Sequence, residues 1–551
     1  MKVLWLILAA LLPASAAAAA PEPKRGTATV TVRMAPDGVN ASFLLDRPVT
    51  EFAFAEADVV RNGEFELRTP GLAFAKDKVT AACPFRRFDV KIRPMTQERD
   101  AKYPAHFRVG SGGVVYAPAL KGEPTQWRTR LDFVTRPGEV RVTGGQPADG
   151  FVFLGPKALR VEHAQIVVVA GPQTPKWLVE RSGSALASAI SAYSAALGAP
   201  LPLKPLLIVT HQPGERNFNV GDVTPGAVTA LRFHRAAWLQ PDAQAEKTIQ
   251  SFMLHEAFHF WNGGLASHAA GTPAWLHEGG AEYAALLAGA HSGLLSGDDA
   301  GRRLSEALGK CRLALQASGD KALDSFAFLP AQLRYPCGMA IQWAADLHIR
   351  AASGGKRNVL DAWAATIAAA RRREARSYAL ADFYAAAGIA SPGSVVPIHM
   401  LVRQSGASRW DGMAAAYNRL GADVAQVPSP TGRRAALLFH LLRENCRDLP
   451  DGTGFGFYID GTIVKLDGPK GCGVLAGDPV LKAIEGGDPF EMPIATYAAV
   501  QRRCAAGGPV IIAAGDGRRI EAACAKPLAD APQDYLVRLW RPEGAQPLGW
   551  K

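Results

Sequence analysis

The stretch SFMLHEAFHFWNGG, residues 251–264, constrains this chain more than any other. His255 and His259 are four residues apart, so in a helix both project from one face and can bind the same ion. Glu256 lies beside them, close enough to reach a water molecule on that ion without being a ligand. Histidine and glutamate buried in an otherwise apolar helix are costly without such a partner. The stretch therefore predicts a metal-binding helix rather than a buried helix with leftover polar residues.

Glu278 is the candidate for a third ligand. It lies in PAWLHEGGAEY, with eighteen residues between it and His259, a gap that allows a loop and a second, antiparallel helix. Zinc in catalytic sites takes three protein ligands and keeps an open position for water. The spacing therefore predicts a Zn²⁺ site made by His255, His259 and Glu278. His277 is expected to be a pocket or surface residue, because a fourth protein ligand would displace the water.

These motifs resemble those of the gluzincin metallopeptidases. The WN pair after HEAFH looks like the HExxHxWN of the glycyl aminopeptidase family, and the aminopeptidase N family is a more distant resemblance. The segment YPCGMAIQWAADLHIR, residues 335–350, is similar to the Tyr-x-Lys-Gly segment of the glycyl aminopeptidase branch, although Cys337 stands where that branch usually has lysine. The resemblance covers roughly residues 180–400 with specific motifs. It implies a thermolysin-like, mainly helical catalytic domain that hydrolyses peptide bonds.

The resemblance also implies roles for single residues. Glu256 would be the general base that takes a proton from water and passes it to the leaving amine. Tyr335 would stabilise the oxyanion, the alternative being an ordinary interhelical tyrosine. Glu282 lies one turn after Glu278 and is expected to orient a ligating histidine, unless it is a solvent-exposed helix glutamate.

Aminopeptidases of the wider family hold the free amine of the substrate with a glutamate in a Gly-x-Met-Glu-Asn strand. The local counterpart is GAVTA, residues 226–230, which places Thr229 at the substrate-binding position and predicts an edge strand. Threonine cannot pair with an ammonium group as a carboxylate does. Peptides with a blocked N-terminus are therefore expected to be cut at least as well as free ones. The alternative is an over-aligned edge strand and an amine anchor elsewhere, for example Glu215.

The pattern along the chain predicts a multidomain α+β protein. Short runs of polar–apolar alternation predict an N-terminal β domain over residues 21–175, and helical, alanine-rich sequence extends the catalytic domain over 176–425. In the last segment, 430–551, the stretch VLAGDPVLKAIEG resembles PDZ domains, which glycyl aminopeptidases carry in this position. A C-terminal PDZ-like β domain is expected there, with a generic β-rich module as the alternative. Its expected partner is an extended peptide bound by β-augmentation.

The first 20 residues have a basic residue, a short apolar run and then small residues, the layout of a signal peptide. We expect export to the periplasm or the medium, with an uncleaved anchor as the alternative, and no stable membrane span. Seven cysteines then favour disulfides, with Cys311 to Cys337 and pairs among the last four as the first candidates. The net charge of +11 is scattered, and the basic run at 371–376 fits a solvated helix face, so nucleic acid is not an expected partner.

Two functions remain open from the sequence. The first is an exported zinc peptidase whose partner is a peptide or protein substrate. The second is a catalytically weak or inactive, peptidase-like scaffold protein that binds partners through its PDZ-like domain. Glu256 favours the first, because a structural zinc site needs no general base beside the metal.

Overall fold

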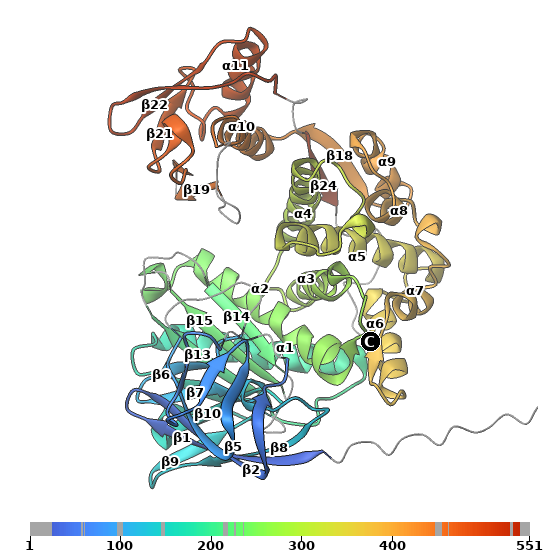
Figure 1. The fold of residues 1–551 in the computed structure, drawn as a ribbon. Coiled ribbons are helices and arrows are strands. Elements are labelled where there is room, and N and C mark those ends of the chain that lie inside the picture. The colour runs from blue at the N-terminus through green and yellow to red at the C-terminus, as the bar shows by residue number, and fades with distance from the viewer. Residues whose placement is uncertain are drawn as a thin grey trace, which may run out of the picture. The chain divides into compact units, whose positions relative to one another are not determined.

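The chain forms two compact units, Met1–Ala158 and Leu159–Lys551, and mixes helices with sheets as a multidomain α+β protein does (Figure 1). The structure is a computed structural model that describes residues 25–56, 59, 61–95, 103–144, 149–212, 219–224, 227–234, 236–446, 455–460, 462–528 and 533–539. The expected signal peptide lies outside these residues. Within them, no single helix has the length and apolar character to cross a membrane, although Leu380–Ser394 and Val396–Val402, bent by 73°, meet those criteria as a pair.

The first unit consists of two β-sheets. One has the order β3-β5-β2-β1-β8, with β4 paired to β5, and the other has the order β6-β7-β10-β9. Their strands are β1 (Gly26–Ala35), β2 (Gly38–Ala53), β3 (Phe65–Leu67), β4 (Ala73–Ala75), β5 (Lys78–Ile92), β6 (His106–Val109), β7 (Gly112–Tyr116), β8 (Trp127–Val134), β9 (Glu139–Val142) and β10 (Phe151–Pro156). Alternate residues of β1 are buried, and the rings of Phe43, Phe52 and Phe88 pack together. The alternation in the sequence thus forms strands, as predicted.

The second unit begins with a five-stranded sheet in the order β11-β12-β13-β15-β14. Its strands are β11 (Arg160–Glu162), β12 (Val167–Ala170), β13 (Leu206–His211), β14 (Asn219–Thr224) and β15 (Val228–Phe233). Helix α1 (Lys176–Leu197) crosses from β12 to β13, which pair in parallel. All residues of β13 and β15 are buried, and β14 forms the edge. Residues 160–170, grouped by sequence with the N-terminal β domain, supply two strands here.

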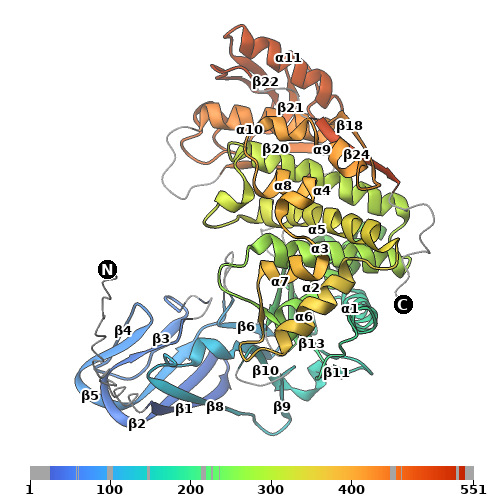
Figure 2. The ribbon, with the colours of Figure 1, turned by 90° about the vertical axis from the view of Figure 1, so that its right-hand side faces the viewer.

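Helices follow the sheet. They are α2 (Ala243–His259), α3 (Ala274–His291), α4 (Gly297–Ala317), α5 (Ala331–Ser353), α6 (Val359–Arg371), α7 (Leu380–Ala387), α8 (Val396–Val402) and α9 (Met413–Asn418). The Asp242 side chain caps α2 by accepting from the Ala245 N–H at 2.7 Å. Short strands β16 (Ser267–His268) and β17 (Ser377–Tyr378) pair in parallel. Figures 1 and 2 show α3, α5 and α4 stacked as successive layers.

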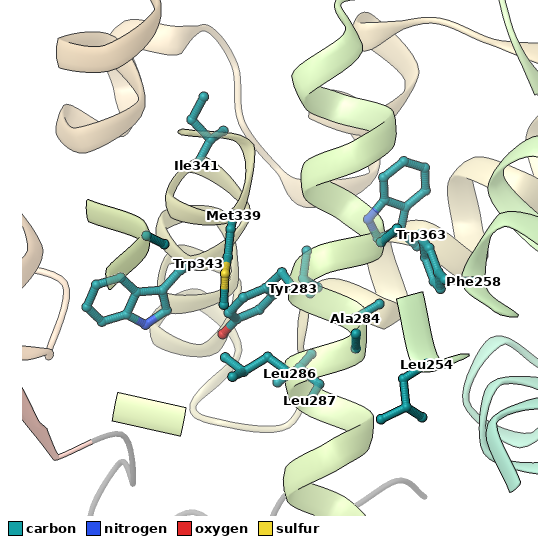
Figure 3. Close-up of a cluster of buried hydrophobic side chains, with 14 of the residues drawn as sticks. Leu254, Phe258, Tyr283, Ala284, Leu286, Leu287, Met339, Ile341, Trp343 and Trp363 are labelled. Carbon is teal, nitrogen blue, oxygen red and sulfur yellow. The ribbon is translucent and has the colours of Figure 1, made fainter. Parts of the chain in front are cut away.

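Apolar side chains from four helices share one core. Figure 3 shows Leu254 and Phe258 of α2 near the α3 residues Ala284 and Leu287, with Met339, Trp343 and Trp363 from α5 and α6 in the same cluster. Burying these large side chains contributes roughly 1.5–3 kcal/mol each to folding. The core thus holds the two helices that carry the predicted ligands against each other.

The C-terminal module, residues 430–528, forms a second small core. Its elements are α10 (Pro430–Asn445), β19 (Gly456–Asp460), β20 (Ile463–Asp467), β21 (Val480–Ile484), α11 (Pro493–Ala505), β22 (Val510–Ala514) and β23 (Arg519–Ala522). The five strands are antiparallel in chain order. After this module the chain returns, because β24 (Gln533–Leu539) pairs with β18 (Asp423–Pro428).

Three disulfides join six of the seven cysteines. They are Cys311–Cys337, Cys446–Cys472 and Cys504–Cys524, and Cys83 is exposed and free. The expected pairing of Cys311 with Cys337 and the pairing among the last four are confirmed. The first disulfide links α4 to α5, and the other two lie in the C-terminal module.

Candidate metal centre and its surroundings

Helix α2 brings His255 and His259 together, and α3 supplies Glu278. The two Nε2 atoms lie 3.1 Å apart, and each lies 3.4 Å from Glu278 Oε2. Both histidines are buried, with 7% and 8% of their surface exposed. The sequence-predicted ligand group is therefore assembled in three dimensions.

The residues fit a zinc-type cation. One ligand atom from each of the three residues lies within 4.8 Å of the other two, and two imidazoles with one carboxylate form a donor set typical of catalytic zinc. Burial by itself raises the pKa of Glu278, but hydrogen bonds from His255 and His259 outweigh it and hold that pKa well below its usual range. The carboxylate is therefore ionised and supplies negative charge to the centre.

Neighbouring groups orient both imidazoles. Glu282 Oε1 lies 3.2 Å from His255 Nδ1, and Asn262 Oδ1 lies 2.9 Å from His259 Nδ1. Because an amide or carboxylate oxygen accepts, each contact favours a proton on Nδ1 and leaves Nε2 as the nitrogen that would face a bound cation. This is the tautomer that a metal-binding histidine needs. The structure places the predicted Glu282 beside His255 Nδ1, and its orienting role stays a prediction.

Asn262 was not predicted as a site residue. It lies in a π-helical turn, Phe260–Leu265, that follows α2, and π-turns recur at functional sites. Its Nδ2 donates to the His277 carbonyl at 2.9 Å, and the Asn262 carbonyl accepts from the Tyr378 hydroxyl at 2.7 Å. Asn262 thus joins the end of α2 to the ligand-bearing turn of α3. The only signal in the sequence was the WN pair after HEAFH.

His277 lies against the centre without joining the ligand group. Its ring stacks on His259, with centroids 4.4 Å apart, and its Nδ1 lies 3.2 Å from the Tyr378 hydroxyl. Burial, and next the nearby His259, lower the pKa of His277 well below the usual value. A neutral, stacked imidazole agrees with the expected pocket role.

Glu256 is buried beside the ligands and faces β14. A Cβ placed on Gly221 would lie 3.0 Å from Glu256 Oε1 and 2.3 Å from the Phe252 ring. Burial, as the largest cause, raises the pKa of Glu256, which makes its carboxylate a stronger base. Because glycine has no side chain, Gly221 leaves room for this carboxylate. No sequence motif pointed to Gly221.

Tyr335 reaches the same centre from α5. Its ring centroid lies 5.8 Å from that of His255, and the Arg334 guanidinium lies 5.1 Å from the centre of the tyrosine ring. Burial, followed by the charge of Glu278, raises the pKa of Tyr335. The phenol therefore keeps its proton and can donate a hydrogen bond.

Thr229 is not part of this group. It lies on β15, between β13 and β14, and is fully buried. The prediction that residues 226–230 form an edge strand is wrong, because β14 pairs along the outer side of β15 and takes the edge itself. Thr229 is therefore an interior sheet residue rather than an edge residue, and a substrate-binding role for it stays a prediction. The alternative anchor, Glu215, lies outside the described residues.

Comparisons with known proteins show the fold. No protein-family model matches the sequence, and no curated protein matches it. Among solved structures the chain is similar to the crystal structure of an aminopeptidase N family protein from Idiomarina loihiensis, with a TM-score of 0.56 and 12% identity over 95% of this chain and 99% of that one. The chain therefore has a distant aminopeptidase-like fold along almost its whole length.

Proposed function

We propose that this chain is an exported, zinc-dependent peptidase of the gluzincin type, closest to the glycyl aminopeptidase family. The observation that carries the proposal is the convergence of His255, His259 and Glu278 with the buried Glu256 beside them. The fold of the aminopeptidase N family protein supports it. A structural metal site would not require a carboxylate of raised pKa next to the ligands.

Two of the chain's own groups would act on the substrate. Glu256 accepts a proton from the attacking water and later delivers it to the leaving amine, as its raised pKa allows. Tyr335 donates a hydrogen bond to the oxygen of the scissile carbonyl as negative charge develops there. Zinc, when held by His255, His259 and Glu278, would supply Lewis acidity to the water and the carbonyl.

Strand β14 lies at the end of the strand order of its sheet, the position at which an extended peptide can add as a further strand. Next to Glu256 this strand has Gly221, which has no side chain, and its Asp222 pairs with the buried Arg232 at 2.7 Å. An aspartate already paired with arginine is a poor partner for a substrate ammonium group. We therefore propose that the substrate is a peptide or protein whose chain extends past the scissile bond on both sides.

Blocked peptides test this substrate class. A peptide that is cut well should be cut at least as well after acetylation of its N-terminus, because no free amine is required. The ratio of kcat/KM for the two forms measures this. Loss of cleavage on acetylation would make the enzyme an aminopeptidase and would place its amine anchor outside β14.

The C-terminal module is proposed to be PDZ-like and to bind an extended peptide. Its sheet has β19 at one edge, where Tyr458 is 61% exposed. Antiparallel addition of a strand at such an edge is a common mode of peptide binding. Fluorescence titration with labelled peptides, with a Tyr458→Asp variant beside the wild type, tests this separately from hydrolysis.

The experiment that tests the enzyme is a peptide-library digest by zinc-loaded protein, read by mass spectrometry. Wild-type protein should hydrolyse peptides, and Glu256→Gln should lower the rate on the order of a thousandfold while zinc stays bound. Absence of hydrolysis by zinc-loaded wild type would leave the scaffold hypothesis in its place.

A further inference from the structure

The helical turn that carries Tyr335 lacks one backbone hydrogen bond, because the next residue is a proline. Pro336 lies inside α5, and a proline has no N–H to donate to the carbonyl four residues earlier. The turn that carries Tyr335 therefore has one backbone hydrogen bond fewer than a regular helix, and contacts with other helices contribute more to its position. Those contacts lie on the two residues that follow the proline.

Gly338 holds α5 against α3. A Cβ placed on Gly279 would lie 2.2 Å from the Gly338 carbonyl carbon, and one on Gly338 would lie 2.4 Å from the Trp275 carbonyl oxygen. The two helices therefore touch backbone to backbone, one residue after the ligand Glu278. This contact limits the approach of α5 from one side but does not stop it from moving away.

Cys337 holds the same turn from the other side. Its disulfide with Cys311 ties α5 to α4, and both cysteines are fully buried. Helix α4 is itself anchored, since the Ser305 hydroxyl accepts from the Val537 N–H of β24 at 2.9 Å. The turn that carries Tyr335 is thus clamped between a glycine contact with α3 and a covalent link to α4.

We infer that the Cys311–Cys337 disulfide is a positioning element of the active site, which holds Tyr335 at its place beside the metal ligands. The inference rests on the proposed function. The cysteines touch no reacting atom, so they act only through Tyr335. A transition-state donor displaced by about 1 Å loses much of its effect, and losses on the order of a hundredfold are known for such misplacement.

The test replaces both cysteines, as Cys311→Ala/Cys337→Ala. We expect kcat to fall at least about tenfold, with KM and zinc content little changed, because binding groups stay in place. Cys446→Ala/Cys472→Ala is a matched control, since both disulfides span 26 residues and so restrict the unfolded chain equally. The control should keep its kcat.

A double-mutant cycle separates positioning from general stability. In a Tyr335→Phe background, removal of the Cys311–Cys337 disulfide should lower kcat no further, because the group it positions is already gone. An equal loss in both backgrounds, or an unchanged kcat in the double alanine variant, would overturn the inference. Should the alanine pair not fold, Cys311→Ala/Cys337→Val restores side-chain volume and undergoes the same cycle.

Failure of the proposed function is distinguishable from failure of this inference. Zinc-loaded wild type without any hydrolysis overturns the function, and with it the inference. If the wild type is active, but loss of the disulfide lowers kcat by the same factor with Tyr335 present as in the Tyr335→Phe background, only the inference is overturned.

Discussion

Two regions of the second unit each contain three side chains of residue types that can bind a metal, with one ligand atom from each within 4.8 Å of the other two. In the helical region these are His255, His259 and Glu278. In the C-terminal module they are His440, Cys504 and Cys524, where His440 Nε2 lies 3.2 Å from Cys524 Sγ. The two sulfurs of the second group form a disulfide, and only thiolates bind metal well.

Charge separates the two groups further. Burial lowers the pKa of His255, but Glu278 and then Glu282 outweigh it, so that the pKa is raised well above its usual value. Burial also lowers the pKa of His440, and Glu444 does not compensate. The comparison teaches that closeness of ligand atoms is not enough. A cation site also needs free donors and negative charge around them.

Zinc affinity tests this contrast most directly and carries the largest expected effect. Glu278→Ala should lower zinc affinity by more than about a hundredfold, because it removes a direct ligand and its charge. His440→Ala should leave about one zinc per chain, the number a single catalytic site holds. Competition with a chromogenic chelator measures both. Zinc loss in the His440 variant would break the comparison.

Two tyrosines extend the contrast to catalysis. Tyr335→Phe should lower kcat on the order of a hundredfold with zinc content and KM nearly unchanged, since its hydroxyl acts in the transition state. Tyr458→Phe, in the C-terminal module, is the matched control and should keep its kcat. An unaffected rate in Tyr335→Phe would mean that another group supplies the hydrogen bond.

Two asparagines test how the imidazoles are oriented. Asn262→Ala should lower zinc affinity about tenfold, because His259 loses the acceptor that fixes its tautomer. Asn445, whose Oδ1 accepts from the Ala523 N–H at 3.0 Å in the C-terminal module, provides the control. Its alanine variant should bind zinc as the wild type does. Equal losses in both variants would point to general destabilisation.

Acid stability gives the smallest expected effect. Burial lowers the pKa of His440 in the folded protein. Below the pKa of the unfolded chain, about 6.5, the unfolded chain therefore binds more protons than the folded protein, and the free energy of unfolding decreases as the pH is lowered. His440→Gln should remove this loss and raise Tm relative to wild type by ~2 °C at pH 5, with a smaller difference at pH 7.5. Thermal unfolding by circular dichroism measures both. A difference independent of pH would contradict the assignment.

The helical site was the most predictable part of the molecule. His255, Glu256 and His259 are linked by helix geometry alone, and Glu278 needed only a loop and a return helix, both local features. Asn262 and Gly221 were missed because their roles depend on partners in other elements, the His277 carbonyl for the first and the Glu256 carboxylate for the second. Metal binding itself stays a prediction.

The sheets show the same division between local and distant causes. Polar–apolar alternation predicted strands in the first unit, because each strand buries one face. It did not predict that β14 would lie outside β15, or that β24 would return to pair with β18 beyond the C-terminal module. Strand order depends on which partners meet across long stretches of chain, and several neighbours suit a buried strand equally well.

The sequence by itself determined the chemistry of the candidate centre, since residue type and spacing along helices place two imidazoles and two carboxylates within reach of one another. Only the tertiary structure decided which strand borders Glu256, which groups orient the ligands, and what holds Tyr335. Those choices come from packing of α2 against β14, from packing between α3 and α5, and from the disulfide that joins Cys311 of α4 to Cys337 of α5. The physical reason is that their free energy arises between residues far apart in the chain, where no local pattern records the partner.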